Sequence, residues 1–198
     1  WWNPMGVVGM IDVGQGDSFF IKEPFKQSVV LIDTGGRMDF TKEEWRRSET
    51  SSHLSERTVI PSLKAQGIKE IDHAIITHPD TDHVGELPII ASQLTVKNLY
   101  TTVDSLRNKE FLQMIDSIPL EKKYLSQKGQ VLPLKNSDLY FLHPEADATS
   151  DDANESSLCM VGKIGNKNWL FTGDAGVESE KLWINKYPNL KIDVLKVG

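Results

Sequence analysis

The sequence predicts an α/β fold with αββα four-layer sandwich architecture, in which two packed mixed sheets lie between outer helices. Strand-like and helix-like segments alternate along both halves of the chain. The halves also echo each other, since residues 31–35 and 170–174 both end an apolar strand in Thr-Gly beside an acidic residue. A polar run at residues 78–83 directly follows an apolar strand, and α/β folds place their functional sites at such strand ends.

The first half reads as three strands followed by alternating helices and strands. Residues 6–12, 18–22 and 28–33 are strand-like, and a glycine-rich turn joins the first two. A polar stretch, residues 37–52, predicts a long surface loop. We expect helices at residues 55–66, 85–94 and 107–118, and strands at 73–77 and 96–101. Pro61 predicts a local irregularity in its helix, and Pro88 requires a place in the first turn.

The second half repeats this alternation. Strands are expected at residues 139–143, 158–164, 169–172 and 193–197, with a turn at 165–168 and a helix at 177–187. No shift in composition divides the 198 residues, so we expect 1–198 to form a single domain.

Bulk composition narrows the function classes. No apolar stretch reaches the roughly 18 residues needed to span a bilayer, and the N-terminus lacks the features of a signal peptide, so we expect a soluble domain. The one cysteine, Cys159, lies in an apolar run, which rules out an internal disulfide and predicts a buried core residue. The net charge of −6 argues against a surface that holds nucleic acid by charge alone. It does not argue against a nuclease, because bound cations offset clustered acidic ligands.

Four side chains able to bind metal lie within one short segment after the strand at 73–77: His78, Asp80, Asp82 and His83. In a tight loop all of them can converge on one point. The alternative is a solvated acidic loop whose aspartate caps the next helix. Two histidines and two aspartates at this spacing favour metal. Because metal sites rich in carboxylates usually activate water, the motif predicts a metal-dependent hydrolase.

One short segment cannot complete two coordination spheres, so further ligands must come from other strand ends. Asp174 follows an apolar strand and precedes a helix, which suits a carboxylate that bridges two ions, with a helix N-cap as the alternative. Asp33 ends the third strand, from where a carboxylate can orient a metal-binding histidine.

For several other residues the sequence is compatible with either a role at the site or an ordinary structural role. Asp17 and Ser18 lie at a glycine-rich turn that either brings backbone N–H groups to phosphate or is simply a turn. Asn154 is either an oxygen ligand, a substrate contact or a loop residue. The long polar loop carries an aromatic residue beside two cations, which either contacts a base and a phosphate or is solvated: Trp45, Arg46 and Arg47.

These residues together resemble the metallo-β-lactamase superfamily, whose hallmark is a motif rich in histidine and aspartate after a strand, with further ligands on later strand ends. Within this superfamily the sequence more closely resembles the C-terminal domain of ComEC-type DNA-uptake (competence) proteins. The similarity covers nearly the whole chain and is carried by residues 12–18, 31–36, 78–83, 154–158, 172–174 and 193–198, of which the first and third segments are the most specific.

The resemblance implies His78 and Asp80 on a first metal, Asp82 and His83 on a second, Asp174 between the two ions and Asp33 behind the ligands. The chain has Asp80 where the superfamily usually has a second histidine, and Asn154 where a third would come. Both changes replace nitrogen by oxygen, which favours Mn²⁺ or Mg²⁺ over Zn²⁺. In ComEC-type proteins a histidine pair follows the Lys-Val-Gly segment, whereas this chain stops at Gly198. The domain is therefore expected to be truncated just before its final ligand motif, with a weak second metal site.

The function implied by the resemblance is a DNA nuclease that degrades one strand during uptake. Divalent ions, Mn²⁺ or Zn²⁺ with Mg²⁺ as a further candidate, would be the cofactors, and no small-molecule cofactor is expected. The catalytic residues would be Asp80, Asp82, His83 and Asp174. The resemblance also implies a bacterial membrane protein whose membrane-spanning segments lie elsewhere, with the side of the membrane undetermined. Two alternatives stay open: a hydrolase of a small thioester, lactam or cyclic phosphate, and a module that binds DNA or a partner without turnover.

Overall fold

The computed structural model describes residues 4–36, 53–146 and 150–197. The long polar loop with Trp45, Arg46 and Arg47 lies outside these residues. One sheet contains, in spatial order, β1 (Val7–Met10), β2 (Phe19–Lys22), β3 (Val29–Ile32), β4 (Glu70–Ile75), β5 (Thr95–Thr101) and β6 (Lys122–Leu125). The other contains β11 (Val194–Lys196), β10 (Lys167–Phe171), β9 (Cys159–Ile164), β8 (Asp138–His143) and β7 (Val131–Pro133).

Both sheets are mixed. In the first, β1, β2 and β3 pair antiparallel, whereas β3, β4, β5 and β6 pair parallel. In the second, β10 and β11 pair parallel and the other neighbours pair antiparallel. Parallel neighbours place their carboxyl ends at the same edge of a sheet, so the segments that follow β3 and β4 emerge side by side.

An apolar core between the two sheets holds them together. Alternate residues of β2 and β3, such as Ile21 and Val30, point into it from the first sheet, and Met160 and Phe171 point into it from the second. The intervening residues of the first sheet, such as Leu31, face the opposite way into a separate core under the helices. Strands buried on both faces explain why these segments read as continuous apolar runs.

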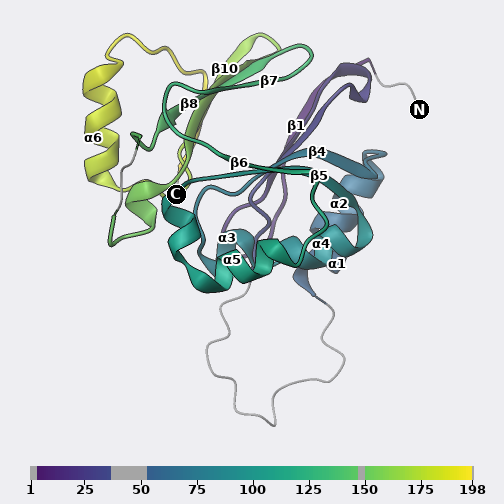
Figure 1. Cartoon of the computed structure of the whole chain (residues 1–198). Coiled ribbons are helices and arrows are strands. Elements are labelled where there is room, and N and C mark those ends of the chain that lie inside the picture. The colour runs from purple at the N-terminus through teal and green to yellow at the C-terminus, as the bar shows by residue number, and fades with distance from the viewer. Residues whose placement is uncertain (1–3, 37–52, 147–149, 198) are drawn as a thin grey trace.

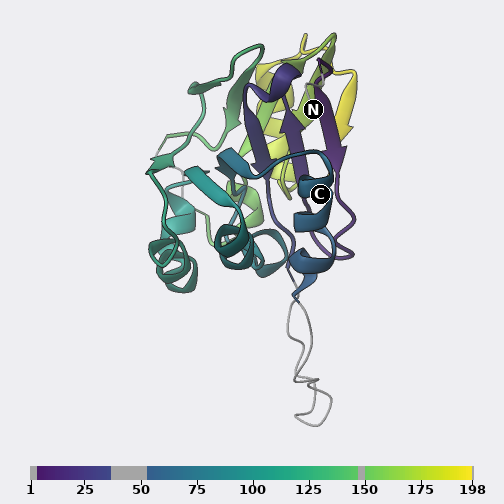
Figure 2. The ribbon, with the colours of Figure 1, turned by 90° about the vertical axis from the view of Figure 1, so that its right-hand side faces the viewer.

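Helices cover the outer face of each sheet. Against the first sheet lie α1 (Leu54–Arg57), α2 (Val59–Ala65), α4 (Leu87–Gln93) and α5 (Lys109–Asp116), with α3 (Thr81–Val84) leading into α4. On the far side, Trp183 of α6 (Val177–Lys186) packs on Leu142 and Leu170 of the second sheet. The described residues also form short 3₁₀ helices, which are η1 (Pro24–Lys26), η3 (Asp104–Arg107) and η4 (Asn154–Ser156). Figures 1 and 2 show this order of helices, sheet, sheet and helix, which confirms the predicted αββα layering.

Most predicted elements are present, and the differences have physical causes. The helix predicted at residues 55–66 is broken at Thr58 and not at Pro61. The break places Pro61 in the first turn of α2, where a missing N–H costs no hydrogen bond. Pro88 likewise lies in the first turn of α4, as its chemistry requires. The sequence did not predict β6 and β7, two edge strands that are too short and too exposed to show an apolar pattern.

The structure confirms the buried position predicted for the cysteine. Cys159 is fully buried in β9, as expected of a core residue. Among the described residues, no helix is long and apolar enough to cross a membrane.

Candidate metal centre

The candidate site lies where the ends of β3, β4 and β10 meet. Asp33 directly follows β3, His78 follows β4, and Asp174 follows β10. His83 lies on α3, the short helix that begins right after the turn carrying His78. The backbone joins these segments, since Leu158 N–H donates to Thr77 O and Asp33 N–H donates to Ile75 O, both at 2.9 Å. Residues far apart in sequence are therefore brought to one edge of the two sheets.

His83 connects two of the predicted carboxylates. Its Nε2 lies 3.1 Å from Asp174 Oδ2, and its Nδ1 lies 3.0 Å from Asp33 Oδ2. The imidazole is 1% exposed, so burial and both partners fix its orientation. A histidine that donates one N–H to a buried carboxylate directs its other nitrogen toward a metal. Asp33 thus occupies the orienting position and Asp174 faces the nitrogen that would bind the ion.

His78 supplies a second imidazole next to the first. The two rings lie 4.1 Å apart between centroids. Thr77 Oγ1 lies 3.1 Å from His78 Nδ1, whereas the buried Nε2 atom has no hydrogen-bond partner among the described residues. A buried nitrogen without a partner is costly in a native protein and indicates a missing ligand or water. One atom each of His78, His83 and Asp174 lies within 4.8 Å of the others, as a shared cation requires.

Asp33 is held in an unusual backbone conformation. Its φ is +53°, in the left-handed region that few residues other than glycine adopt, and its side chain is 1% exposed. The carboxylate accepts hydrogen bonds from Thr77 N–H at 2.8 Å and from Thr77 Oγ1 at 2.7 Å, besides contacting His83. These bonds stabilise the strained residue and join β3 to the turn that carries the metal motif.

The two other aspartates of the motif lie at the edge of this cluster. Asp80 is at the N-cap position of α3, yet its side chain makes no capping hydrogen bond. Its Oδ2 instead lies 3.7 Å from His78 Nε2. Asp82 is half-buried and, among the described residues, joins neither the group of His78, His83 and Asp174 nor a second group of possible ligands, which is Asp17, Asp33 and His83. The structure therefore groups Asp80 with His78, and it does not bring the Asp82 carboxylate into the same cluster.

Asp174 is not the cap of the helix that follows it. The N-cap of α6 is Gly176, and the free N–H of Ser179 is satisfied by Glu155 Oε2 at 3.0 Å. Asp174 N–H instead donates to Ser157 Oγ at 3.3 Å, and its carboxylate contacts His83 and Lys196. The preceding Gly173 has φ +54°, and a Cβ there would lie 3.0 Å from Thr77 Cβ.

The glycine-rich turn after β1 also reaches this site. Ser18 is buried and its Oγ donates to Asp33 O at 3.2 Å. Asp17 Oδ2 lies 3.9 Å from His83 Nδ1 and forms an ion pair with Lys196. The turn can lie against the metal motif because Gly16 has no side chain: a Cβ there would lie 1.8 Å from Asp82 O. Glycine also permits the φ of +75° that the chain adopts at this position. Asp17 and Ser18 thus contact the site from behind the ligands.

Asn154 lies in η4, close in sequence to Ser157. Its buried Oδ1 has no hydrogen-bond partner among the described residues. An amide oxygen without a hydrogen-bond partner fits the expected ligand or substrate role, but none of the hydrogen bonds or ion pairs of the described residues joins it to the two histidines.

Sequence reasoning missed two residues of the site, Thr77 and Lys196. The strand pattern places Thr77 only at the end of a strand, whereas in the structure its hydroxyl, next to the metal-motif histidine, donates to the buried carboxylate of Asp33. Lys196 belongs to segment 193–198, which carries part of the family resemblance. A lysine at the end of an apolar strand was the sequence signal that could have marked it as a residue of the site.

The charges of the cluster depend on one another. Burial disfavours the charged form of His83, but hydrogen bonds to Asp174 and Asp33 outweigh it and raise the pKa of His83 to about 10. The hydrogen bond with His83 holds the pKa of Asp174 well below its usual range. Burial, and then the charge of His83, lower the pKa of His78. In the metal-free protein the pocket therefore keeps a positive charge on His83, and it offers the unprotonated His78 to a cation.

The residues present fit a divalent ion. The donor set combines two imidazoles with a carboxylate, and the orienting carboxylate of Asp33 stands behind one imidazole. The lack of a hydrogen-bond partner for the buried His78 Nε2, within the part of the chain that the structure describes, is an independent sign that an ion or its bound water belongs there.

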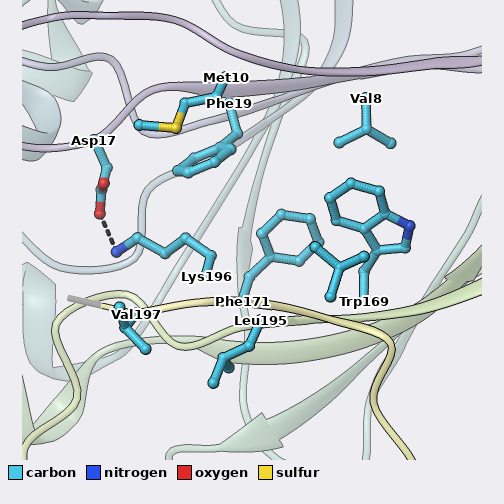
Figure 3. A pocket seen from close by; sticks show the side chains of 10 residues that line it. Val8, Met10, Asp17, Phe19, Trp169, Phe171, Leu195, Lys196 and Val197 are labelled. Atoms are coloured by element: carbon cyan, nitrogen blue, oxygen red, sulfur yellow. Dashed lines mark ion pairs between the residues drawn. The ribbon is translucent and has the colours of Figure 1, made fainter.

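A cavity of about 420 Å³ borders the site beyond Asp17 and Lys196. Figure 3 shows Phe19, Trp169 and Phe171 along it, with Lys196 reaching Asp17 at one end. The cavity lies between the β1–β2 edge of one sheet and the β10–β11 edge of the other.

Comparison with known proteins gives the class to which this fold and site belong. The family model of the Metallo-beta-lactamase superfamily matches residues 11–197. The chain therefore belongs to the metallo-β-lactamase superfamily, as its motifs predicted. Among solved structures, Rm3 metallo-beta-lactamase superposes with a TM-score of 0.63 at 13% identity, over 99% of this chain and 76% of that one. BJP-1, a subclass B3 metallo-beta-lactamase of Bradyrhizobium japonicum, gives 0.60 at 17% identity, over 100% and 78%.

Two curated relatives refine this assignment. The chain is 39% identical to ComE operon protein 3 of Bacillus subtilis (strain 168) over 98% of its own length and 25% of that protein. It is 24% identical to Competence protein ComA of Neisseria gonorrhoeae, over 94% of this chain and 22% of that protein. The chain thus spans about a quarter of the length of these relatives, and it is a homologue of competence proteins with a hydrolase fold.

Proposed function

We propose that residues 1–198 form a single metal-dependent phosphodiesterase domain that hydrolyses DNA in a competence protein. The observation that carries the proposal is the cluster of His78, His83 and Asp174, in which the buried His78 Nε2 has no hydrogen-bond partner among the described residues. The competence proteins among the relatives support DNA as the substrate. The parent protein would supply membrane-spanning segments, by the same analogy.

Each residue has a distinct part in this proposal. His78, His83 and Asp174 would hold a divalent ion, with Asp80 next to His78 as a further ligand. Bound there, the ion would activate water and stabilise charge on the phosphate and on the leaving oxygen. Asp33 would keep the His83 ring in place with its Nδ1 protonated, so that Nε2 remains free to coordinate. Asp80 or Asp82 would accept the proton from the attacking water.

The mixed nitrogen and oxygen ligands support Mn²⁺ or Mg²⁺ as the preferred ion over Zn²⁺. Metal analysis and titration of activity test this part. Zn²⁺ alone at full occupancy and full activity would contradict it.

The decisive experiment measures cleavage of single-stranded DNA by the purified chain with and without MnCl₂. The same assay is run on a longer segment of the protein that continues beyond Gly198, because the implied second metal site needs further ligands. We expect Mn²⁺-dependent cleavage that Asp174→Ala abolishes while DNA binding is kept, and that Asp82→Ala also abolishes if Asp82 is the proton acceptor. Cleavage that persists in EDTA would exclude metal-dependent catalysis. Binding without cleavage under every condition would favour the binding module, and turnover of a small thioester or cyclic phosphate without DNA cleavage would favour the small-molecule hydrolase.

A further inference from the structure

Lys196 is a nearly buried cation at the border of the metal centre. It is the last residue of β11, paired in register with Phe171 of β10. Its side chain is 8% exposed, whereas its neighbour Leu195 is 53% exposed. Its backbone is held as well, because Thr172 Oγ1 donates to Lys196 O at 2.9 Å. A lysine is seldom buried unless it is paired, so its partners explain its place.

The partners of the ammonium come from two separate turns. Lys196 Nζ forms an ion pair with Asp17, donates to Gly173 O at 2.9 Å and lies 3.5 Å from Asp174 Oδ1. Figure 3 shows the side chain stretched toward Asp17. An ammonium has three N–H donors, and three oxygens surround this one. Lys196 therefore links the glycine-rich turn after β1 to the turn after β10, and it has no donor left for a substrate.

The two oxygens of the Asp174 carboxylate face different cationic side chains. Asp174 Oδ2 faces His83 at 3.1 Å, and Oδ1 faces Lys196 at 3.5 Å. An ion held by His78, His83 and Asp174 would share this carboxylate with the ammonium. Two cations on one carboxylate repel each other, and the repulsion is screened weakly where water is excluded.

We infer that Lys196 is a built-in counter-cation, which holds Asp17 and Asp174 together before metal binds and thereby lowers the affinity of the centre for divalent ions. This inference rests on the metal centre of the proposed function and adds the residue that sets its affinity. Lys196 is a positioning residue here, since it acts through the two aspartates. Without it, Asp17 and Asp174 would be free to hold additional positive charge.

Isothermal titration of the metal-free chain with MnCl₂ tests the inference without any measurement of catalysis. We expect Lys196→Met to bind Mn²⁺ at least tenfold more tightly than the wild type, and Lys196→Arg to stay within threefold of it because the charge is retained. Lys181→Met is the matched control, since Lys181 is 61% exposed and forms an ion pair with Glu178 on the same helix, which is not a residue of the metal centre. It removes the same charge and should leave the affinity unchanged.

Thermal unfolding in EDTA and in MnCl₂ provides the second measurement. Lys196→Met should be less stable than the wild type in EDTA and should gain more from Mn²⁺, since the ion replaces the lost cation. Should Lys196→Met not fold, Lys196→Gln, which keeps hydrogen-bond donors without the charge, carries the same comparison.

The outcomes separate the two proposals. Equal or weaker Mn²⁺ binding by Lys196→Met than by the wild type would overturn the inference and leave the proposed function standing. An affinity increase of the same size in Lys181→Met would also overturn it, because net charge alone would then explain the effect. No Mn²⁺ binding by the wild type or by any variant would contradict both.

Discussion

Replacement of Asp33 by asparagine tests whether a buried carboxylate controls the tautomer of His83. Asparagine has nearly the same shape and tolerates the left-handed backbone conformation with φ +53°, so the change adds little strain. The carboxylate accepts three hydrogen bonds, two from Thr77 and one from His83 Nδ1. An amide keeps one acceptor oxygen for Thr77 N–H and presents an NH₂ group to the remaining partners.

The expected magnitude follows from these contacts. Because the NH₂ group cannot accept a proton from His83 Nδ1, either this hydrogen bond is lost or His83 gives up its Nδ1 proton and accepts from the amide, which leaves its one proton on the nitrogen that faces Asp174. Hydrogen bonds to charged groups contribute about 1.5–3 kcal/mol each, so we expect Asp33→Asn to lower the free energy of unfolding by about 2–4 kcal/mol. The affinity for Mn²⁺ should fall roughly 10–100-fold, as it does when an orienting partner of a metal ligand is removed.

Chemical denaturation in EDTA measures the first effect and titration with MnCl₂ measures the second. Asp72→Asn is the matched control, since Asp72 accepts bonds from Val29 N–H and Lys97 Nζ, both at 2.9 Å, but lies on β4 itself and not at the strand end with the metal centre. It should lower stability without changing the metal affinity. Unchanged Mn²⁺ binding by Asp33→Asn, or an equal loss in Asp72→Asn, would refute the reasoning.

Three further predictions use other parts of the structure. Gly14→Ala should lower the free energy of unfolding by about 1–2 kcal/mol, because φ is +75° at Gly14 and the space around it is open. Gly16→Ala should lower it clearly more and weaken Mn²⁺ binding, because the added Cβ would lie 1.8 Å from Asp82 O. Equal losses of stability in thermal unfolding would contradict this prediction. Hydrogen bonds from a serine hydroxyl on α6 lower the pKa of Glu155 below its ordinary value of 4.5, so this group stabilises the fold above pH 4.5 and the stabilisation is lost as the pH falls through the lowered pKa. Glu155→Gln should therefore be less stable than the wild type at pH 7, and urea denaturation should show the difference shrinking in acid; a constant difference would count against it. Burial raises the pKa of the Cys159 thiol to about 12, so iodoacetamide at pH 8 should modify it only as fast as the protein unfolds, and rapid modification of the native chain would show that the thiol is accessible.

The layered fold could be predicted from the sequence because strands and helices leave strong local patterns. Buried strands such as β2 and β3 are continuous apolar runs, and the outer helices carry apolar residues at helical spacing. The edge strands β6 and β7 escaped prediction because they are held by one neighbour each and show no burial pattern of their own. The break at Thr58 also depends on packing and not on the nearby proline.

The sequence by itself determined the kind of chemistry, because two histidines and two aspartates in one short segment after an apolar strand, His78 to His83, have few uses other than metal binding. Only the tertiary structure decided which side chains meet. It groups Asp174 with both imidazoles, places Asp33 behind one of them and brings Lys196 next to Asp17. These contacts join residues separated by up to 179 positions. The physical reason is that ligand type is a local property of the chain, whereas distances between strand ends are set by sheet pairing and by the packing of the two sheets.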